Sequence, residues 1–276
     1  MDQYVVIGNP VEHSKSPRIH AEFARQTGQD MNYGKLYSEL DDFETVVADF
    51  IEQGGKGANI TVPFKERAWR LVEKHGEHAR LAGAVNTLVL DATGSMIGHN
   101  TDGIGLVRDI TDNHGGDFQD KRVLVLGAGG ASRGILLPLL QSGAGEITIA
   151  NRTPEKAHDL AQMFSQHSNN FGKLRGCGFD GVTDQQYDWV INATAASLQG
   201  SLPSLPDNLL ASGAWCYDLM YSNEPTLFCQ WAIRHGAARS LDGLGMLVEQ
   251  AAESFYLWRK VRPDAAGVIE MLKKAG

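Results

Sequence analysis

The stretch that most constrains the fold runs from Lys121 to Gly134. It reads as a strand, a glycine-rich turn and the start of a helix. Val123 to Leu126 is an uninterrupted apolar run, which is typical of a parallel strand covered on both faces. A second strand is predicted in the stretch Glu146–Thr153, which ends in Asn-Arg-Thr. This strand–turn–helix–strand order predicts an α/β fold built on a parallel sheet.

The glycine turn has the residues needed to receive a pyrophosphate. Gly127 permits a tight turn, and Gly129 lacks a Cβ, so the backbone can approach a ligand closely. A helix that begins near Gly130 presents unpaired N–H groups and its positive dipole end to an anion. The spacing, with Gly134 beyond, departs from a strict G-x-G-x-x-G, and such turns also occur without a ligand. The flanking strands favour a dinucleotide site.

The end of the second strand indicates which dinucleotide is bound. An Asp or Glu about 20 residues after the glycines would bind the ribose 2′-hydroxyl of NAD. Here the chain has Asn151, Arg152 and Thr153, with Lys156 a little further on. A guanidinium can bind a phosphate with two parallel hydrogen bonds, whereas a carboxylate would repel it. We therefore expect NADP rather than NAD, although an isolated Arg and Lys on a solvated loop are common.

Length and charge exclude several classes of protein. A chain of 276 residues is long enough to form two domains. A formal net charge of −8 argues against nucleic acid or an anionic membrane as the main partner. The three cysteines are scattered, so neither a disulfide framework nor a metal site is expected. No signal peptide and no apolar run of membrane-spanning length is evident, which predicts a cytoplasmic protein.

Further strands and helices are predicted on both sides of the glycine turn. Ser16 is the expected N-cap of a helix that ends near Gly28, and Asp242 opens a helix with one buried face. The other predicted elements are strands at 4–7, 57–62, 85–90, 189–194 and 214–218, and helices from Asp41 or Asp42 to Ile51 and from 103 to 110. The pattern predicts two α/β lobes with a cleft between them.

Three polar clusters stand where predicted strands end. They are Ser14–Ser16, Asn59–Lys65, and Asn86–Thr87 together with Asn100–Asp102. The hydroxyls, carboxamides, lysine ammonium groups and aspartate carboxylate of these clusters suit a small polyhydroxylated acid. Reduction of a ketone also needs a proton donor beside the forming alkoxide, and Lys65 paired with Asp102 is the candidate. Each residue also has an ordinary structural role open to it, as a helix cap, turn residue or solvated charge.

These residues carry a resemblance to the bacterial shikimate dehydrogenases that extends from Gly8 to Trp258. Seven motifs appear in the family order. They are GNPVEHSKSP at 8–17, GANITVPFK at 57–65, GAVNT at 83–87, NTDG at 100–103, GAGGA at 127–131, NRT at 151–153 and DGLGMLVEQ at 242–250. The resemblance implies reversible, NADPH-dependent reduction of 3-dehydroshikimate to shikimate, a step of aromatic amino acid biosynthesis.

The resemblance also implies domains and a set of site residues. A substrate-binding domain would comprise residues 1–101 plus 238–276, and a Rossmann-like NADP-binding domain 102–237. Lys65 and Asp102 would form the catalytic pair. The implied shikimate ligands are Ser14, Ser16, Thr61, Lys65, Asn86, Asp102, Tyr221 and Gln250. The implied cofactor-lining residues are Gly127, Ala128, Gly129, Gly130, Ala131, Asn151, Arg152, Thr153, Lys156, Leu219, Gly243 and, more weakly, Glu77. The helix from Gly243 would return to the first lobe and close the substrate site.

Three departures from the family pattern stand out. Ala195 and Ala196 lie where relatives tend to have a serine, in a loop expected near the nicotinamide. Pro225 is displaced from Tyr221, and His99 replaces a common acid. A quinate/shikimate dehydrogenase that uses NAD and a non-catalytic NADP-binding regulator remain the alternatives. The expected partner is a small molecule, in a monomer or homodimer, with neither nucleic acid nor membrane.

Overall fold

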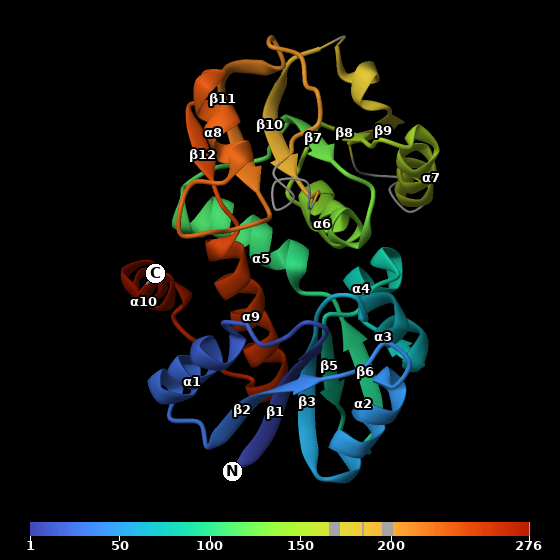
Figure 1. Ribbon diagram of the computed structural model, residues 1–276, viewed down its shortest axis with the longest axis vertical. Coiled ribbons are helices and arrows are strands. Elements are labelled where there is room, and N and C mark those ends of the chain that lie inside the picture. Colours follow the sequence, from blue (N-terminus) through green and yellow to red (C-terminus); the bar gives the residue numbers. More distant parts are fainter. Residues whose placement is uncertain (166–171, 184, 195–200, 276) are drawn as a thin grey trace. The chain divides into compact units, whose positions relative to one another are not determined.

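The computed structural model describes residues 1–165, 172–183, 185–194 and 201–275. The chain forms two compact units, Met1–Gly105 with Leu247–Gly276, and Leu106–Met246 (Figure 1). Both passages between units occur within helices, α5 (Asp102–Arg108) and α9 (Leu244–Arg259). The passages therefore fall a little later in the chain than the domain boundaries predicted from sequence.

The first unit is built on a six-stranded mixed sheet. Its strands are ordered β2-β1-β3-β5-β6-β4, and β5 runs antiparallel to both β3 and β6. The elements are β1 (Asp2–Gly8), α1 (Ser16–Thr27), β2 (Met31–Tyr37), α2 (Phe43–Glu52), β3 (Gly55–Ile60), α3 (Lys65–Leu71), β4 (Lys74–His75), α4 (Glu77–Ala82), β5 (Thr87–Leu90), β6 (Met96–His99), α5, α9 and α10 (Ala265–Ala275).

The interior strand β1 is buried on both faces of the sheet, to which its successive side chains point alternately. Val5 and Ile7 pack into an apolar cluster with Phe43 of α2. Tyr4, on the other face, lies with its ring centroid 4.7 Å from that of Trp258 in α9. Helix α9, red in Figure 1, thus covers one face of this sheet although it comes more than 150 residues after β5 in the chain.

The second unit is a doubly wound parallel sheet. Its strands are ordered β12-β11-β10-β7-β8-β9, which is the 3-2-1-4-5-6 order of Rossmann folds. The elements are η1 (Asp109–Asn113, a π-helical turn), β7 (Arg122–Leu126), α6 (Gly130–Gln141), β8 (Glu146–Ala150), α7 (Pro154–Ser165), β9 (Lys173–Cys177), η2 (Phe179–Val182), β10 (Tyr187–Asn192), β11 (Leu210–Asp218), α8 (Leu227–Arg234) and β12 (Arg239–Leu241).

Helices on both faces bury the strand that the sequence marks most clearly. Leu124 and Leu126 of β7 pack in one cluster with Phe228 of α8. Val123 and Val125 point to the other face, and their exposed fraction is also 0%. The predicted fold class, two α/β units of which one has a mixed sheet and one is Rossmann-like, is confirmed. Among the described helices, none combines the length and the apolar character that a membrane crossing requires.

The predicted start of the first helix is wrong by one residue. Ser16 is expected as the N-cap, but α1 begins at Ser16, and the capping position is Lys15. The reason is that Ser14 supplies the hydroxyl: its Oγ accepts a hydrogen bond from the backbone N–H of Ser16 at 3.3 Å. Pro17 lies in the first turn, and Gly28 ends the helix in the left-handed conformation, as the sequence predicts.

A buried histidine lies on the face of the first sheet that α9 covers. The His20 ring is fully buried and stacks on Tyr33, with ring centroids 4.1 Å apart. Neither ring nitrogen makes a hydrogen bond to any described residue. Burial lowers the pKa of His20 to about 3, although the nearby Asn59 side chain raises it slightly. Folding therefore requires the neutral imidazole.

We predict that His20 makes the protein less stable in mild acid. Between pH 6.5 and about 3 the unfolded chain binds a proton at His20 that the folded chain excludes, so stability falls as pH decreases. At pH 5 this effect should lower the free energy of unfolding by roughly 2 kcal/mol relative to neutral pH. Urea unfolding at pH 7 and pH 5 should show that His20→Phe loses less stability than the parent. His13→Asn, at an exposed position, is the control, and equal pH dependence in all three proteins would contradict the prediction.

Candidate active site

The central feature of the first unit is an ion pair between Lys65 and Asp102. Lys65 opens α3 and Asp102 opens α5, and Lys65 Nζ donates to Asp102 Oδ2 at 2.7 Å. The side chains are 26% and 10% exposed, so Lys65 is partly open to solvent while the carboxylate is largely covered. The sequence proposes these two residues as partners, and the structure brings them together.

The second carboxylate oxygen is held by an asparagine. Asn86 Nδ2 donates to Asp102 Oδ1 at 2.8 Å and lies 3.3 Å from Gln250 Oε1 of α9. Asn86 Oδ1 in turn accepts from the backbone N–H of Thr101 at 2.9 Å. The backbone N–H of Asp102 donates to Asn100 Oδ1. The carboxylate is thus held at both oxygens. The Lys65 ammonium has three N–H donors and uses one of them on Asp102, so it has donors left for a ligand.

A buried polar network supports this group from behind. Asn59 Nδ2, at the end of β3, lies 3.1 Å from both Thr87 Oγ1 of β5 and Ser254 Oγ of α9. Asn59 Oδ1 accepts from the Tyr33 hydroxyl at 2.7 Å. Ser254 was not identified from sequence. Its position four residues after Gln250, on the same face of α9, is the signal that could have identified it.

The remaining predicted substrate ligands of the first unit lie after parallel strands. Ser14 and Ser16 follow β1, and Thr61 follows β3, the strand that pairs with β1. Thr61 donates its backbone N–H to Ile7 O at 3.0 Å. The carboxyl ends of parallel strands are where open α/β sheets bind ligands.

Burial raises the pKa of the Tyr33 hydroxyl well above its ordinary value, although a hydrogen bond with the neighbouring Ser16 side chain acts in the opposite direction.

In the second unit the glycine turn leaves space beside the backbone. Gly127 has a φ of +107°, which side-chain-bearing residues rarely adopt. A Cβ on Gly129 or Gly130 would have none of the described residues' atoms within 4 Å, apart from its own neighbours in the chain. No described side chain caps the start of α6, so its first N–H groups are available to an anion. Ala128 and Ala131 complete the turn, which fits a pyrophosphate.

The segment after β8 presents two cations. Arg152 and Lys156 are exposed, and neither forms an ion pair with any of the residues that the structure describes. Asn151 Nδ2 donates to the Thr153 carbonyl at 2.9 Å and so fixes the turn that precedes α7. The position and charge of these side chains fit a 2′-phosphate.

Two more cofactor-lining candidates touch each other. The Cα of Gly243 is so close to the Leu219 carbonyl that an added Cβ would collide with it. Tyr221 follows two residues after Leu219 and lies in the second unit, unlike the other predicted shikimate ligands. Glu77 lies exposed in the first unit, at the start of α4. The Ala195–Ala196 departure lies outside the described residues.

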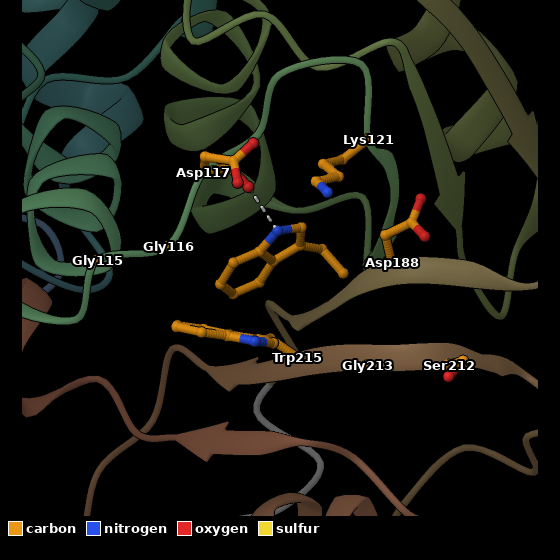
Figure 2. A pocket seen from close by; sticks show the side chains of 9 residues that line it. Gly115, Gly116, Asp117, Lys121, Asp188, Ser212, Gly213 and Trp215 are labelled. Carbon is orange, nitrogen blue, oxygen red and sulfur yellow. Dashed lines mark hydrogen bonds between the residues drawn. The ribbon is translucent and has the colours of Figure 1, made fainter.

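A small cavity of about 140 Å³ lies elsewhere in the second unit. Trp189 and Trp215 form part of its wall together with Lys121 and Asp188 (Figure 2). Lys121 precedes β7, Asp188 and Trp189 lie near the start of β10, and Trp215 of β11 pairs with Trp189, so the cavity is at the opposite end of the sheet from the glycine turn. Its size and its place therefore separate it from the predicted site.

Comparison with known proteins identifies the family. Three family models match: the shikimate dehydrogenase substrate binding domain over residues 6–88, shikimate / quinate 5-dehydrogenase over 109–199, and the shikimate 5′-dehydrogenase C-terminal domain over 243–273. A shikimate dehydrogenase (NADP(+)) from Alkalilimnicola ehrlichii is 55% identical over 272 residues, covering 99% of this chain and 98% of that protein. The chain belongs to the shikimate dehydrogenase family.

Further family members agree with this assignment, which confirms the resemblance seen in the sequence. A shikimate dehydrogenase (NADP(+)) from Nitrosococcus oceani is 52% identical, with 99% of this chain and 95% of that protein covered. The crystal structure of shikimate 5-dehydrogenase from Thermus thermophilus in complex with NADP(H) and shikimate has a TM-score of 0.87 at 30% identity and covers 100% of both chains. The name of the Nitrosococcus oceani protein and the ligands of the Thermus thermophilus structure both give NADP, the cofactor that the sequence predicts here.

We predict that alanine at two glycines of the turn affects different properties: NADP affinity at Gly129 and fold stability at Gly127. Gly129→Ala should leave the unfolding midpoint unchanged, because its Cβ would have open space among the residues that the structure describes. It should weaken NADP binding about 10- to 100-fold, the equivalent of roughly 1–3 kcal/mol of steric cost. Gly127→Ala should destabilise the fold itself, because it forces a side chain to adopt a positive φ. Calorimetric titration with NADP and thermal unfolding would separate the two; unaltered NADP affinity in Gly129→Ala would count against the pyrophosphate site.

Proposed function

We propose that this chain catalyses the reversible NADPH-dependent reduction of 3-dehydroshikimate to shikimate. The observation that carries the proposal is the ion pair between Lys65 Nζ and Asp102 Oδ2, whose other oxygen is held by Asn86. It holds the ammonium of a partly exposed lysine in a fixed position beside a set of amide and hydroxyl groups. Membership of the shikimate dehydrogenase family supports the same reaction.

The Lys65 ammonium is suited to the oxygen of the reacting ketone. As negative charge develops on that oxygen, a positioned N–H donor stabilises the transition state and can supply the proton. Asp102 fixes the direction of the ammonium, and Asn86 keeps the carboxylate from turning away. NADPH, when bound, supplies the hydride that completes the reduction. In the reverse direction the same pair receives the proton of the shikimate hydroxyl.

The other polar groups match the rest of the substrate. Ser14, Ser16 and Thr61 offer hydroxyls for the carboxylate of shikimate, and Asn86 and Gln250 offer amides for its ring hydroxyls. Tyr221 adds a phenolic hydroxyl. For the cofactor, the backbone of 127–131 would bind the pyrophosphate and Arg152 and Lys156 the 2′-phosphate, with Asn151, Thr153, Leu219, Gly243 and Glu77 as further contacts.

A grid of steady-state assays tests the function. The rate of NADP reduction is measured by absorbance with shikimate and with quinate, each in the presence of NADP and of NAD. We expect the highest kcat/KM with shikimate and NADP. Comparable rates with quinate and NAD would instead identify a quinate/shikimate dehydrogenase. Cofactor binding without turnover in any combination would identify a non-catalytic NADP-binding protein and overturn the proposal.

Lys65→Ala should lower kcat far more than it raises KM. An interaction that strengthens in the transition state affects kcat, and loss of a positioned acid typically costs about 10²- to 10⁴-fold in rate. Lys74→Ala is the matched control, since Lys74 also forms an ion pair at 3.2 Å but with the turn residue Asp91. If Lys65→Ala keeps kcat and only raises KM, Lys65 binds substrate without taking part in the chemical step.

A further inference from the structure

Hydrogen bonds hold both ends of the segment that carries Tyr221. It runs from Leu219, just after β11, to Thr226, the N-cap of α8. At its start, the backbone N–H of Leu219 donates to Asn192 O at 2.9 Å. The Met220 carbonyl accepts from the backbone N–H of Gly243 at 3.0 Å. Between these ends, residues 222–225 are exposed.

A single carboxylate joins the two ends. Asp218 is fully buried, with an exposed fraction of 0%. Its Oδ1 accepts from the backbone N–H of Met220 at 3.1 Å, and its Oδ2 accepts from the Thr226 hydroxyl at 2.6 Å. Thr226 Oγ1 at the same time accepts from the backbone N–H of Cys229 at 3.1 Å, which caps α8. The start of the segment and the start of α8 therefore share one anchor.

The same carboxylate reaches the neighbouring strand. Asn192 Nδ2, at the end of β10, donates to Asp218 Oδ1 at 3.0 Å. Asn192 Oδ1 accepts from both the backbone N–H and the hydroxyl of Thr194, at 3.1 and 2.7 Å. The methyl group of Thr194 is among the nearest atoms to Gly127 of the glycine turn. Asp218 thus connects the carboxyl-terminal ends of two strands to the Tyr221 segment.

A buried carboxylate is costly unless its oxygens accept hydrogen bonds, and here it accepts from side chains and backbone on three separate elements. A charged acceptor makes these bonds stronger than a neutral amide would. We propose that Asp218 is a positioning residue that holds Tyr221 in place for the substrate through Met220 and Thr226. This proposal rests on the proposed function, because it assigns Tyr221 to shikimate binding.

Two variants isolate the contact with Thr226. Thr226→Val removes the hydroxyl with little change in volume, whereas Thr226→Ser keeps both of its hydrogen bonds. Thr226→Val should lower kcat/KM for shikimate about 10-fold, a typical loss when a buried charged acceptor loses a donor. Thr226→Ser should restore most of it. Equal activity in Thr226→Val and the parent would overturn the proposal.

A double-mutant cycle separates positioning from general destabilisation. If Asp218 acts through Tyr221, Asp218→Asn should lower kcat/KM in the parent and have little further effect in a Tyr221→Phe background. Additive losses would mean that Asp218 supports the fold without positioning Tyr221. Asp188→Asn is the matched control, at the other end of β10, where the carboxylate accepts from Arg122. Asp188→Asn should change kcat/KM by the same factor in the parent and in the Tyr221→Phe background.

A chemical probe decides the question without an activity assay. Nitration of Tyr221 by tetranitromethane, followed by mass spectrometry, reports how firmly the segment is held. The modification should be several-fold faster in Thr226→Val and Asp218→Asn than in the parent, Thr226→Ser and Asp188→Asn. Unchanged nitration rates would overturn the positioning role. A parent protein that lacked activity with shikimate would overturn the proposed function instead, while the nitration result would still stand.

Discussion

The first unit depends on hydrogen bonds buried between β3, β5 and α9. Asn59, Thr87 and Ser254 come from three elements distant in sequence and satisfy one another away from water. An unpaired buried amide would cost about 1–3 kcal/mol, so the network admits little displacement of α9 against the sheet. Since α9 also supplies Gln250, the same constraint fixes the polar wall around Asn86 and Asp102. Fold stability and site geometry therefore rely on the same side chains.

The second unit achieves its geometry by a different means. There the backbone, and not a side-chain network, forms the proposed cofactor contact: Gly127 adopts a positive φ, and Gly129 leaves open space in front of the first turn of α6. Thr194 lies beside Gly127 of that turn, and Asn192, which accepts hydrogen bonds from Thr194, also donates to Asp218 at the carboxyl end of the adjacent strand. A rigid set of polar residues beneath a bare backbone surface lets an anion approach closely while the shape of the surface stays constant.

Sequence reasoning predicted the features that rest on strong local signals. The apolar run of β7, the glycine turn and the end of α1 at Gly28 follow from steric rules that act within a few residues. The edge strands β2 and β9 were not predicted, because residues such as Asn32 and Lys35 interrupt the apolar pattern where one side faces solvent. The pairing of Lys65 with Asp102 was anticipated by chemistry. The contacts of Ser254 and Asp218 depend on which elements meet in space, and no short motif encodes that.

The charge of the protein adds a final constraint on how such a site can work. Both proposed ligands are anionic, yet the chain carries a formal net charge of −8. The long-range field therefore opposes their approach, and attraction must come from groups within about 10 Å, the distance over which salt screens exposed charges at 0.1 M. Arg152 and Lys156 are exposed and have no carboxylate partner among the described residues, so a phosphate would not compete with a protein carboxylate for them. Lys65 is different, because Asp102 neutralises it. Its contribution to an anionic substrate is directional hydrogen bonding more than net attraction, which is the property that a developing alkoxide requires.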